Sequence, residues 1–178
     1  LASPFVVTPF LLYAESLLRL SGLKYTIMRN SLYMDPIVHW LPSILKMQTI
    51  PYPTGQGRCG FVMRQDIARA AAAVLCSEGH EGKIYHFTGP QTLSTEDLCR
   101  ITSETTGKEV HYKEAFADDY VRVSKREGEP EVMIHTLLSL YHAIRDGHLN
   151  IQSNDIRDLT GKEPRSLAQV LQESGHTG

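Results

Sequence analysis

The chain has 178 residues, enough for one well-buried domain and too few for a second of any size. Its composition, with 42% hydrophobic and 21% charged residues, is that of an ordinary globular protein. Eighteen basic and 20 acidic side chains give a formal net charge of −2. This charge does not favour binding to nucleic acid or to an anionic membrane surface.

The cysteines and the first residues indicate a cytoplasmic protein. The cysteines are three, an odd number, and lack C-x-x-C spacing: Cys59, Cys76 and Cys99. They are therefore interpreted as thiols in a reducing compartment. The first ten residues contain two prolines and no basic region, which is unlike a targeting sequence. No apolar run approaches the roughly 18 residues that would span a bilayer.

A helix followed by a strand is expected at the start of the chain. Thr8 and Pro9 form a helix start, a capping hydroxyl followed by proline at the first helical position, and Gly22 closes the helix. The stretch 24–29 follows at once and predicts a strand. A helix that ends in glycine and leads directly into a strand is half of a parallel α/β unit.

Helices and short strands alternate through the middle of the chain. Pro36 and Pro42 predict a start and a kink in a helix over 33–45. After a loop rich in proline and glycine, the expected elements are a strand over 61–64, an alanine-rich helix over 66–77 and a strand over 83–88.

Helices dominate the rest of the sequence. Ser94 and Asp97 fit a capping box, and Gly107 ends the helix that this box begins. The further elements expected are a strand over 109–112 and helices over 115–126, 131–146, 154–159 and 166–173. The fold class is therefore α/β with a helical C-terminal half.

Three glycines, Gly55, Gly57 and Gly60, superficially resemble a phosphate-binding loop. Such a loop follows a strand and opens a helix, so that backbone amides and the helix dipole meet the phosphate. These glycines follow a proline-rich turn and precede a predicted strand, which favours plain turn glycines.

The residues alone show no complete catalytic apparatus. The eight histidines do not cluster at ligand spacing, and no metal site is expected. Acidic pairs such as Asp118 and Asp119 are interpreted as solvated charge. The sequence also lacks a G-x-S-x-G nucleophile elbow and a G-x-x-x-x-G-K-[ST] loop.

Several segments resemble a known family. The stretch 21–33, Ser-Gly-Leu-Lys-Tyr-Thr-Ile-Met-Arg-Asn-Ser-Leu-Tyr, follows a helix that carries Glu15. The stretches 61–75 and 79–90 continue the match in order, the former with an arginine and an aspartate ahead of an alanine run. Together they resemble the NmrA-like branch of the atypical short-chain dehydrogenases/reductases, and in particular its NAD(P)H:quinone oxidoreductase type, over nearly the whole chain.

This resemblance implies the C-terminal part of a Rossmann-like NAD(P)-binding fold with a smaller, mostly helical substrate domain. In these terms, 1–33 hold the last helix and strand of the Rossmann domain. The substrate-binding part is 34–178, interleaved with the remaining Rossmann elements at about 61–90. The chain starts with leucine and aligns with the second half of the family only, so it is expected to be a fragment. The first strand and its glycine-rich loop, where adenosine and pyrophosphate bind in the family, have no counterpart in it.

The resemblance also implies a cofactor, NADP or NAD with NADPH favoured, whose nicotinamide half lies beyond the end of the strand. The residues implied in cofactor binding are Asn30, Ser31, Leu32, Tyr33, Met34, Asp35 and Arg64. Those expected to bind substrate are Tyr33, His39 and Trp40, with Ile37 and Phe61 as further pocket walls. Structural roles stay open for three of these: Arg64 could simply pair with Asp66, and Tyr33 and Trp40 could be packed aromatics.

The implied function is hydride transfer from NAD(P)H to a quinone-like acceptor. No Tyr-x-x-x-Lys dyad occurs, and the helix positions where the family often has His and Thr carry Leu11 and Ala14. Hydride transfer to a quinone needs positioning and a shaped apolar pocket rather than such a dyad. The alternative is a non-catalytic, dinucleotide-binding redox sensor of the NmrA type. The partner expected is a small-molecule acceptor, without nucleic acid, membrane or metal, and the protein is a monomer or a homodimer.

Overall fold

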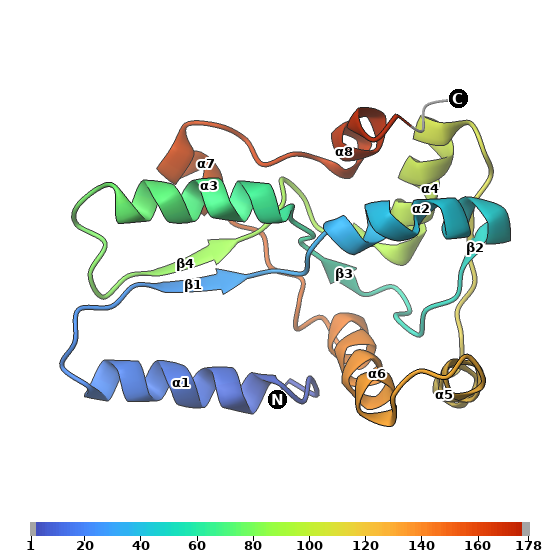
Figure 1. Cartoon of the computed structure of the whole chain (residues 1–178), viewed down its shortest axis with the longest axis horizontal. Coiled ribbons are helices and arrows are strands. Elements are labelled where there is room, and N and C mark those ends of the chain that lie inside the picture. Colours follow the sequence, from blue (N-terminus) through green and yellow to red (C-terminus); the bar gives the residue numbers. More distant parts are fainter. Residues whose placement is uncertain (1–2, 176–178) are drawn as a thin grey trace.

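A pair of parallel strands organises one end of the molecule in the computed structural model, which describes residues 3–175 (Figure 1). The helices are α1 (Thr8–Leu20), α2 (Asp35–Met47), α3 (Arg64–Leu75), α4 (Thr95–Thr106), α5 (Ala117–Arg126), α6 (Glu131–Arg145), α7 (Asp155–Thr160) and α8 (Leu167–Glu173). The strands are β1 (Ile27–Asn30), β2 (Thr49–Ile50), β3 (Arg58–Cys59), β4 (Ile84–Phe87), β5 (Leu93–Ser94) and β6 (His111–Tyr112). The α/β class expected from the sequence is therefore confirmed.

The strands β1 and β4 pair in parallel, with Ile27 opposite Ile84 and Asn30 opposite Phe87. Helix α1 lies on one side of this pair, and α3 and α7 lie on the other (Figure 1). On the α3 side, Val62, Ala70, Phe87 and Ile156 form one buried apolar cluster. The two strands thus end together, and the chain leaves both carboxyl ends towards the second part of the molecule.

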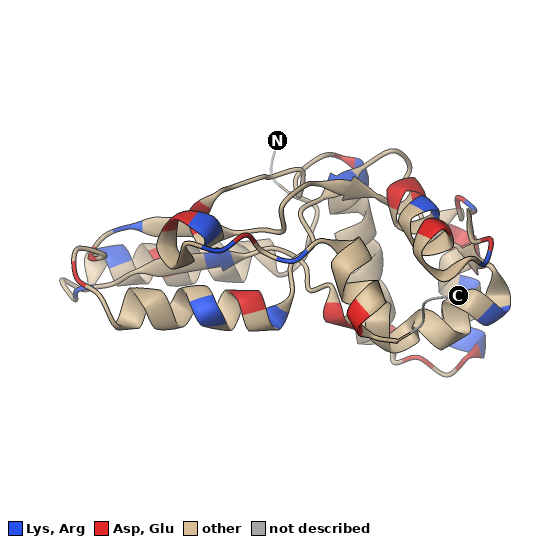
Figure 2. Cartoon of the chain, turned by 90° about the horizontal axis from the view of Figure 1, so that it is seen from above, with Lys and Arg blue, Asp and Glu red and all other residues tan. Residues whose placement is uncertain are grey.

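Helices and two minor strand pairings make up that second part. Strand β2 pairs with β6 in parallel, and β3 pairs with β5 in antiparallel. Helices α2, α4 and α8 meet in a core, whose buried residues are Met34, Leu41, Leu93, Leu98, Ile101, Leu167, Val170 and Leu171. Helices α5 and α6 lie on the other side of β3 in Figure 1. Figure 2 shows acidic and basic residues interspersed along the helices at both ends of the molecule.

The helix predictions agree well with the structure, because most depend on local signals. The capping box is present: Ser94 Oγ accepts from the Asp97 N–H at 3.1 Å, and the Asp97 carboxylate accepts from the Ser94 N–H at 3.1 Å. The expected start of the first helix is wrong in detail. Thr8 lies inside α1, and the N-cap is Val7, which makes no side-chain capping bond.

The strand predicted over 61–64 is wrong. Only Val62 makes a parallel bridge there, to Tyr33, and Arg64 already begins α3. The physical reason is that the Asp35 carboxylate accepts the Arg64 N–H at 3.1 Å, which satisfies the first amide of a helix instead of extending a strand.

Helix α1 has an apolar surface that the rest of the described chain does not cover. None of its residues is buried, and Phe10 and Leu20 are 75% and 84% exposed. An ion pair holds the helix against β1, with Arg29 Nη2 2.6 Å from Glu15 Oε2. The hydrogen bond from Arg29 lowers the pKa of Glu15 despite partial burial, so this carboxylate is ionised at neutral pH.

Candidate functional site

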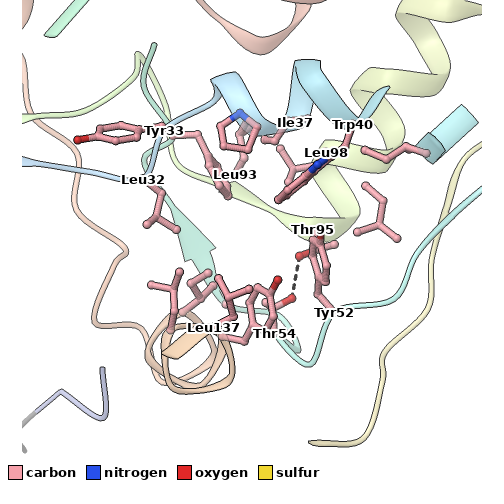
Figure 3. A pocket seen from close by; sticks show the side chains of 18 residues that line it. Leu32, Tyr33, Ile37, Trp40, Tyr52, Thr54, Leu93, Thr95, Leu98 and Leu137 are labelled. Atoms are coloured by element: carbon pink, nitrogen blue, oxygen red, sulfur yellow. Dashed lines mark hydrogen bonds between the residues drawn. The ribbon is translucent and has the colours of Figure 1, made fainter. Parts of the chain in front are cut away.

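A cavity of about 250 Å³ lies beyond the carboxyl ends of β1 and β4, between α2, α4 and α6. Figure 3 shows its side chains converging from these helices and from the segment after β2. Its lining is almost entirely apolar and consists of Leu32, Tyr33, Pro36, Ile37, Trp40, Ile44, Ile50, Tyr52, Thr54, Gly57, Phe61, Leu93, Thr95, Leu98, Leu137, Leu140, Tyr141 and Ile144. Such a lining favours a flat or apolar ligand over a charged one.

Aromatic rings build one corner of the cavity. Tyr52 stacks on Tyr141 with ring centroids 4.8 Å apart, and Tyr120 meets Tyr141 edge-on at 5.3 Å. Burial raises the pKa of both Tyr52 and Tyr141, so both remain neutral phenols across the physiological range. This corner therefore supplies an uncharged stacking surface.

Two threonine hydroxyls stand out in this apolar wall. The Oγ1 atoms of Thr54 and Thr95 are 2.7 Å apart, and the two residues are only 2% and 5% exposed (Figure 3). Neither residue was predicted as functional, since each is an ordinary threonine in a different segment. Only the packing of the segment after β2 against the start of α4 brings them together.

The residues expected to bind the cofactor form one continuous strip at the end of β1. The Ser31 N–H donates to the Phe87 carbonyl at 2.9 Å, which extends the β1–β4 pairing by one residue. Val62 then donates its N–H to the Leu32 carbonyl and accepts the Met34 N–H at its own carbonyl, both at 2.9 Å. These two hydrogen bonds flank the parallel bridge between Tyr33 and Val62.

The strip offers few free groups to a ligand. Asn30 is exposed at the strand end, whereas Ser31 Oγ lies 3.6 Å from the Cys59 sulfur. Leu32 and Tyr33 line the cavity, and Tyr33 is 45% exposed rather than a packed core aromatic. The Met34 side chain is 1% exposed within the core, and its N–H is bonded to Val62. A ligand can therefore meet Asn30, Leu32 and Tyr33 most directly.

Asp35 and Arg64 complete the strip as an ion pair, with Arg64 Nε 2.9 Å from Asp35 Oδ1. Partial burial of Asp35 opposes ionisation, yet hydrogen bonds from the Arg64 side chain and backbone leave the pKa of Asp35 below its usual value. The carboxylate thereby occupies the start of α3, the position that an anionic phosphate would otherwise favour.

The open alternative that Arg64 pairs with Asp66 is wrong. Asp66 is fully buried and binds Arg69 at 2.7 Å and the Arg165 N–H at 2.9 Å. It ties α3 to the segment before α8, which lies about a hundred positions further along the chain. Arg64 instead pairs with Asp35 across 29 positions.

The two residues of α2 that were expected to bind substrate, His39 and Trp40, lie in different surroundings. Trp40 lines the cavity and is 49% exposed, so it is not the core residue allowed as an alternative. His39 is exposed and is not part of the cavity lining, contrary to the expected pocket wall. The reason is helical geometry, because neighbouring positions point about 100° apart. Positions 36, 37, 40 and 44 share one face of α2 and line the cavity, and among them is the expected wall Ile37. The other expected wall, Phe61, also lines the cavity.

The glycine-rich segment serves close packing. A Cβ atom on Gly57 would lie 2.1 Å from the Ile144 carbonyl oxygen, and one on Gly60 would lie 2.7 Å from the Ile151 carbonyl oxygen. Gly55 alone of the three has positive φ, +52°, as in a turn. The expectation of plain turn glycines therefore holds for Gly55, whereas Gly57 lets the loop approach α6 and lines the cavity.

Cys59 and Cys99 are buried free thiols. Burial raises the pKa of Cys59 and of Cys99 to about 11, so neither is a thiolate at neutral pH. No group of three metal-ligating side chains lies together within residues 3–175. Over the same residues, no helix is long and apolar enough to cross a membrane.

Comparison with protein-family models finds no match. Among curated proteins, the chain is 28% identical to quinone oxidoreductase 2 of Escherichia coli over 157 residues, which are 88% of this chain and 55% of that protein. It is 26% identical to an NmrA-like family domain-containing oxidoreductase of Aspergillus flavus, over 86% of this chain and 50% of that protein. The chain thus spans about half the length of the curated relatives it matches.

Three solved structures each match more than nine-tenths of the chain. A nucleoside-diphosphate-sugar epimerase from Staphylococcus aureus superposes with a TM-score of 0.89 at 34% identity, covering 96% of this chain and 60% of that one. The NADPH complex of the E. coli quinone oxidoreductase gives 0.90 at 27% identity, covering 97% and 61%. Triphenylmethane reductase from Citrobacter sp., bound to NADP(H), gives 0.84 at 30% identity, covering 92% and 57%.

The likeness inferred from the sequence motifs is confirmed. The chain is homologous to NmrA-like oxidoreductases and to quinone oxidoreductase 2. Its fold matches part of Rossmann-like, NAD(P)-binding reductases.

Proposed function

We propose that the protein is an NAD(P)H-dependent oxidoreductase that passes a hydride to a flat, quinone-like acceptor. The observation that carries the proposal is the apolar cavity, which opens where β1 and β4 end and shares Leu32 and Tyr33 with the expected nicotinamide strip. Cofactor strip and acceptor cavity therefore adjoin each other.

The cavity suits this chemistry because it positions an acceptor without reacting with it. The aromatic corner offers stacking surface for a planar ring, and its phenols stay neutral. A bound nicotinamide supplies the hydride, and the chain supplies orientation and exclusion of water.

The residues at the strand end fit the nicotinamide half of such a cofactor. Asn30 is exposed there, while Leu32 and Tyr33 border the cavity. The remaining strip residues, Ser31, Met34, Asp35 and Arg64, support this edge through their bonds to Phe87, Val62 and each other. NADP is the preferred form, in line with the NADPH and NADP(H) complexes of two similar structures.

The expected domain division belongs to the same proposal. In it, 1–33 and about 61–90 form the cofactor-facing part, and the rest of 34–178 forms the acceptor part.

The absence of disulfides among the described cysteines is in line with a cytoplasmic location.

The test is NADPH oxidation by the full-length protein with simple quinones as acceptors. Trp40→Ala removes an aromatic wall of the cavity and should raise KM for the quinone about tenfold, with NADPH affinity unchanged. His39→Ala is the matched control, because this neighbouring side chain on α2 is exposed outside the cavity. Equal kinetic effects of the two substitutions would contradict the proposed acceptor site.

Two other functions predict different results. A redox-sensing regulator should distinguish NADPH from NADP⁺ in binding and oxidise nothing. A sugar-nucleotide epimerase, the activity named for one similar structure, needs to bind a charged diphosphate and a polar sugar. The apolar lining of this cavity does not favour such a ligand.

A further inference from the structure

The hydroxyl pair of Thr54 and Thr95 is a polar feature of the cavity that the proposed hydride transfer leaves unexplained. Thr54 lies in the segment after β2, and Thr95 is the first residue of α4. Both residues are more than nine-tenths buried, both line the cavity, and their Oγ1 atoms are 2.7 Å apart (Figure 3).

The hydrogen bonds around this pair form a short chain. The Tyr112 hydroxyl donates to the Tyr52 carbonyl at 3.0 Å, so its proton is committed. Thr54 Oγ1 lies 3.5 Å from the Tyr112 hydroxyl, a long and weak contact. Within residues 3–175, the Thr95 hydroxyl has no hydrogen bond other than the one to Thr54.

The chain can run in two directions with little cost. When Thr95 donates to Thr54, Thr54 donates to Tyr112, and Thr95 presents a free lone pair to the cavity. When Thr54 donates to Thr95, only the 3.5 Å contact is given up, and Thr95 presents a free proton. The strong 2.7 Å bond persists in both arrangements, because a hydroxyl both donates and accepts.

We propose that the Thr54–Thr95 pair is the polar anchor of the cavity, binding one oxygen of a planar acceptor through the Thr95 hydroxyl. This rests on the proposed function, which makes the acceptor a quinone-like compound. The Thr95 proton meets the carbonyl oxygen of the oxidised acceptor. Reduction adds the hydride of NAD(P)H and one proton from solvent water, so the same oxygen becomes a hydroxyl, and Thr95 accepts from it once the pair has reversed. The ligand class is therefore an apolar ring bearing a carbonyl or hydroxyl group.

The experiment compares duroquinone with durene, the tetramethylbenzene that lacks both carbonyl oxygens. Duroquinone is fully substituted, so it does not add to thiols such as the exposed Cys76. Affinities of both compounds are measured by calorimetry of the full-length protein, with and without NADP⁺. Quenching of Trp40, a cavity wall, is a second readout for duroquinone.

Thr95→Val removes the hydroxyl while keeping the shape of the side chain. It should weaken duroquinone binding about 5- to 50-fold, because the ligand carbonyl is then buried without a partner. Durene binding should stay within about twofold. Thr95→Ser restores the hydroxyl and should bind duroquinone within about threefold of the unaltered protein. Thr54→Val is the second variant if Thr95→Val does not fold, and it should weaken duroquinone selectively as well.

The anchor would be overturned if Thr95→Val lost affinity for duroquinone and for durene to the same extent. It would also be overturned if the duroquinone affinity of Thr95→Val were unchanged, or if the unaltered protein did not bind duroquinone. These outcomes are separate from the proposed function. A protein that binds duroquinone through Thr95 without oxidising NADPH contradicts only the proposed function. A protein that reduces duroquinone with an unchanged KM in Thr95→Val contradicts only the anchor.

Discussion

Replacing Gly57 by alanine should displace α6 from the cavity and destabilise the fold. The added Cβ would lie 2.1 Å from the Ile144 carbonyl oxygen and 2.7 Å from the Arg145 Cα. Both contacts are backbone atoms, so no side chain can rotate away. Ordinary contact begins at 3.4 Å, and the end of α6 must therefore retreat by about 1.3 Å.

The expected cost of this displacement is about 3 kcal/mol, the upper end of the range for overpacking. For a chain of this size, that corresponds to a fall in Tm of about 6–12 °C. Guanidinium unfolding gives the free energy, and quinone affinity reports the cavity, which Ile144 and Tyr141 of α6 line.

Gly82→Ala is the matched control, with the same added methyl group. Gly82 has φ +71° and no atom within 4 Å of a new Cβ, so this variant carries backbone strain without collision. It should cost about 1 kcal/mol and leave quinone affinity unchanged. If Gly57→Ala is no more destabilising than Gly82→Ala, the close approach of the loop to α6 is refuted.

Three further substitutions test the contacts that hold the fold. Asp66→Asn leaves the partly exposed Arg165 guanidinium without its buried carboxylate partner and should cost about 2–4 kcal/mol in urea unfolding; a loss below about 0.5 kcal/mol would contradict this role. Ser94→Ala removes the capping hydroxyl of α4 and should cost about 1 kcal/mol, measured in the same way, whereas no loss would mean that the cap is not formed in solution. Since Arg29 lowers the pKa of Glu15 in the folded state, this pair stabilises the fold above the ordinary value of 4.5 and loses its effect as the pH falls through the lowered pKa. Unfolding free energies between about pH 3 and 7 should therefore fall less steeply on the acid side in Glu15→Gln; parallel curves would refute the linkage.

The elements that follow from local chemistry could be predicted from the sequence. The capping box of Ser94 and Asp97 involves residues three positions apart, so its geometry is contained in the pattern itself. The pairing of Arg64 was missed because its partner, Asp35, lies 29 positions away, while Asp66 lies nearby in sequence but is buried among other arginines.

The cavity could be predicted only in part. The resemblance drew attention to Tyr33 and Trp40, which both line it. Its other walls come from separate segments, such as Tyr52 after β2 and Tyr141 on α6, and only tertiary packing brings their rings to 4.8 Å. The helix expected over 131–146 is present as α6, but the periodic apolar pattern of a helix does not tell a core face from a cavity face.

The most direct measurement of the central claim is a single turnover of the full-length protein with NADPH bound. The complex is mixed rapidly with duroquinone, and the absorbance of the reduced nicotinamide is followed. The proposed oxidoreductase predicts loss of this absorbance on mixing, with one NADP⁺ formed for each occupied site. NADPH that stays bound and unoxidised, with quinones and with dye acceptors alike, would contradict the claim and favour a redox sensor.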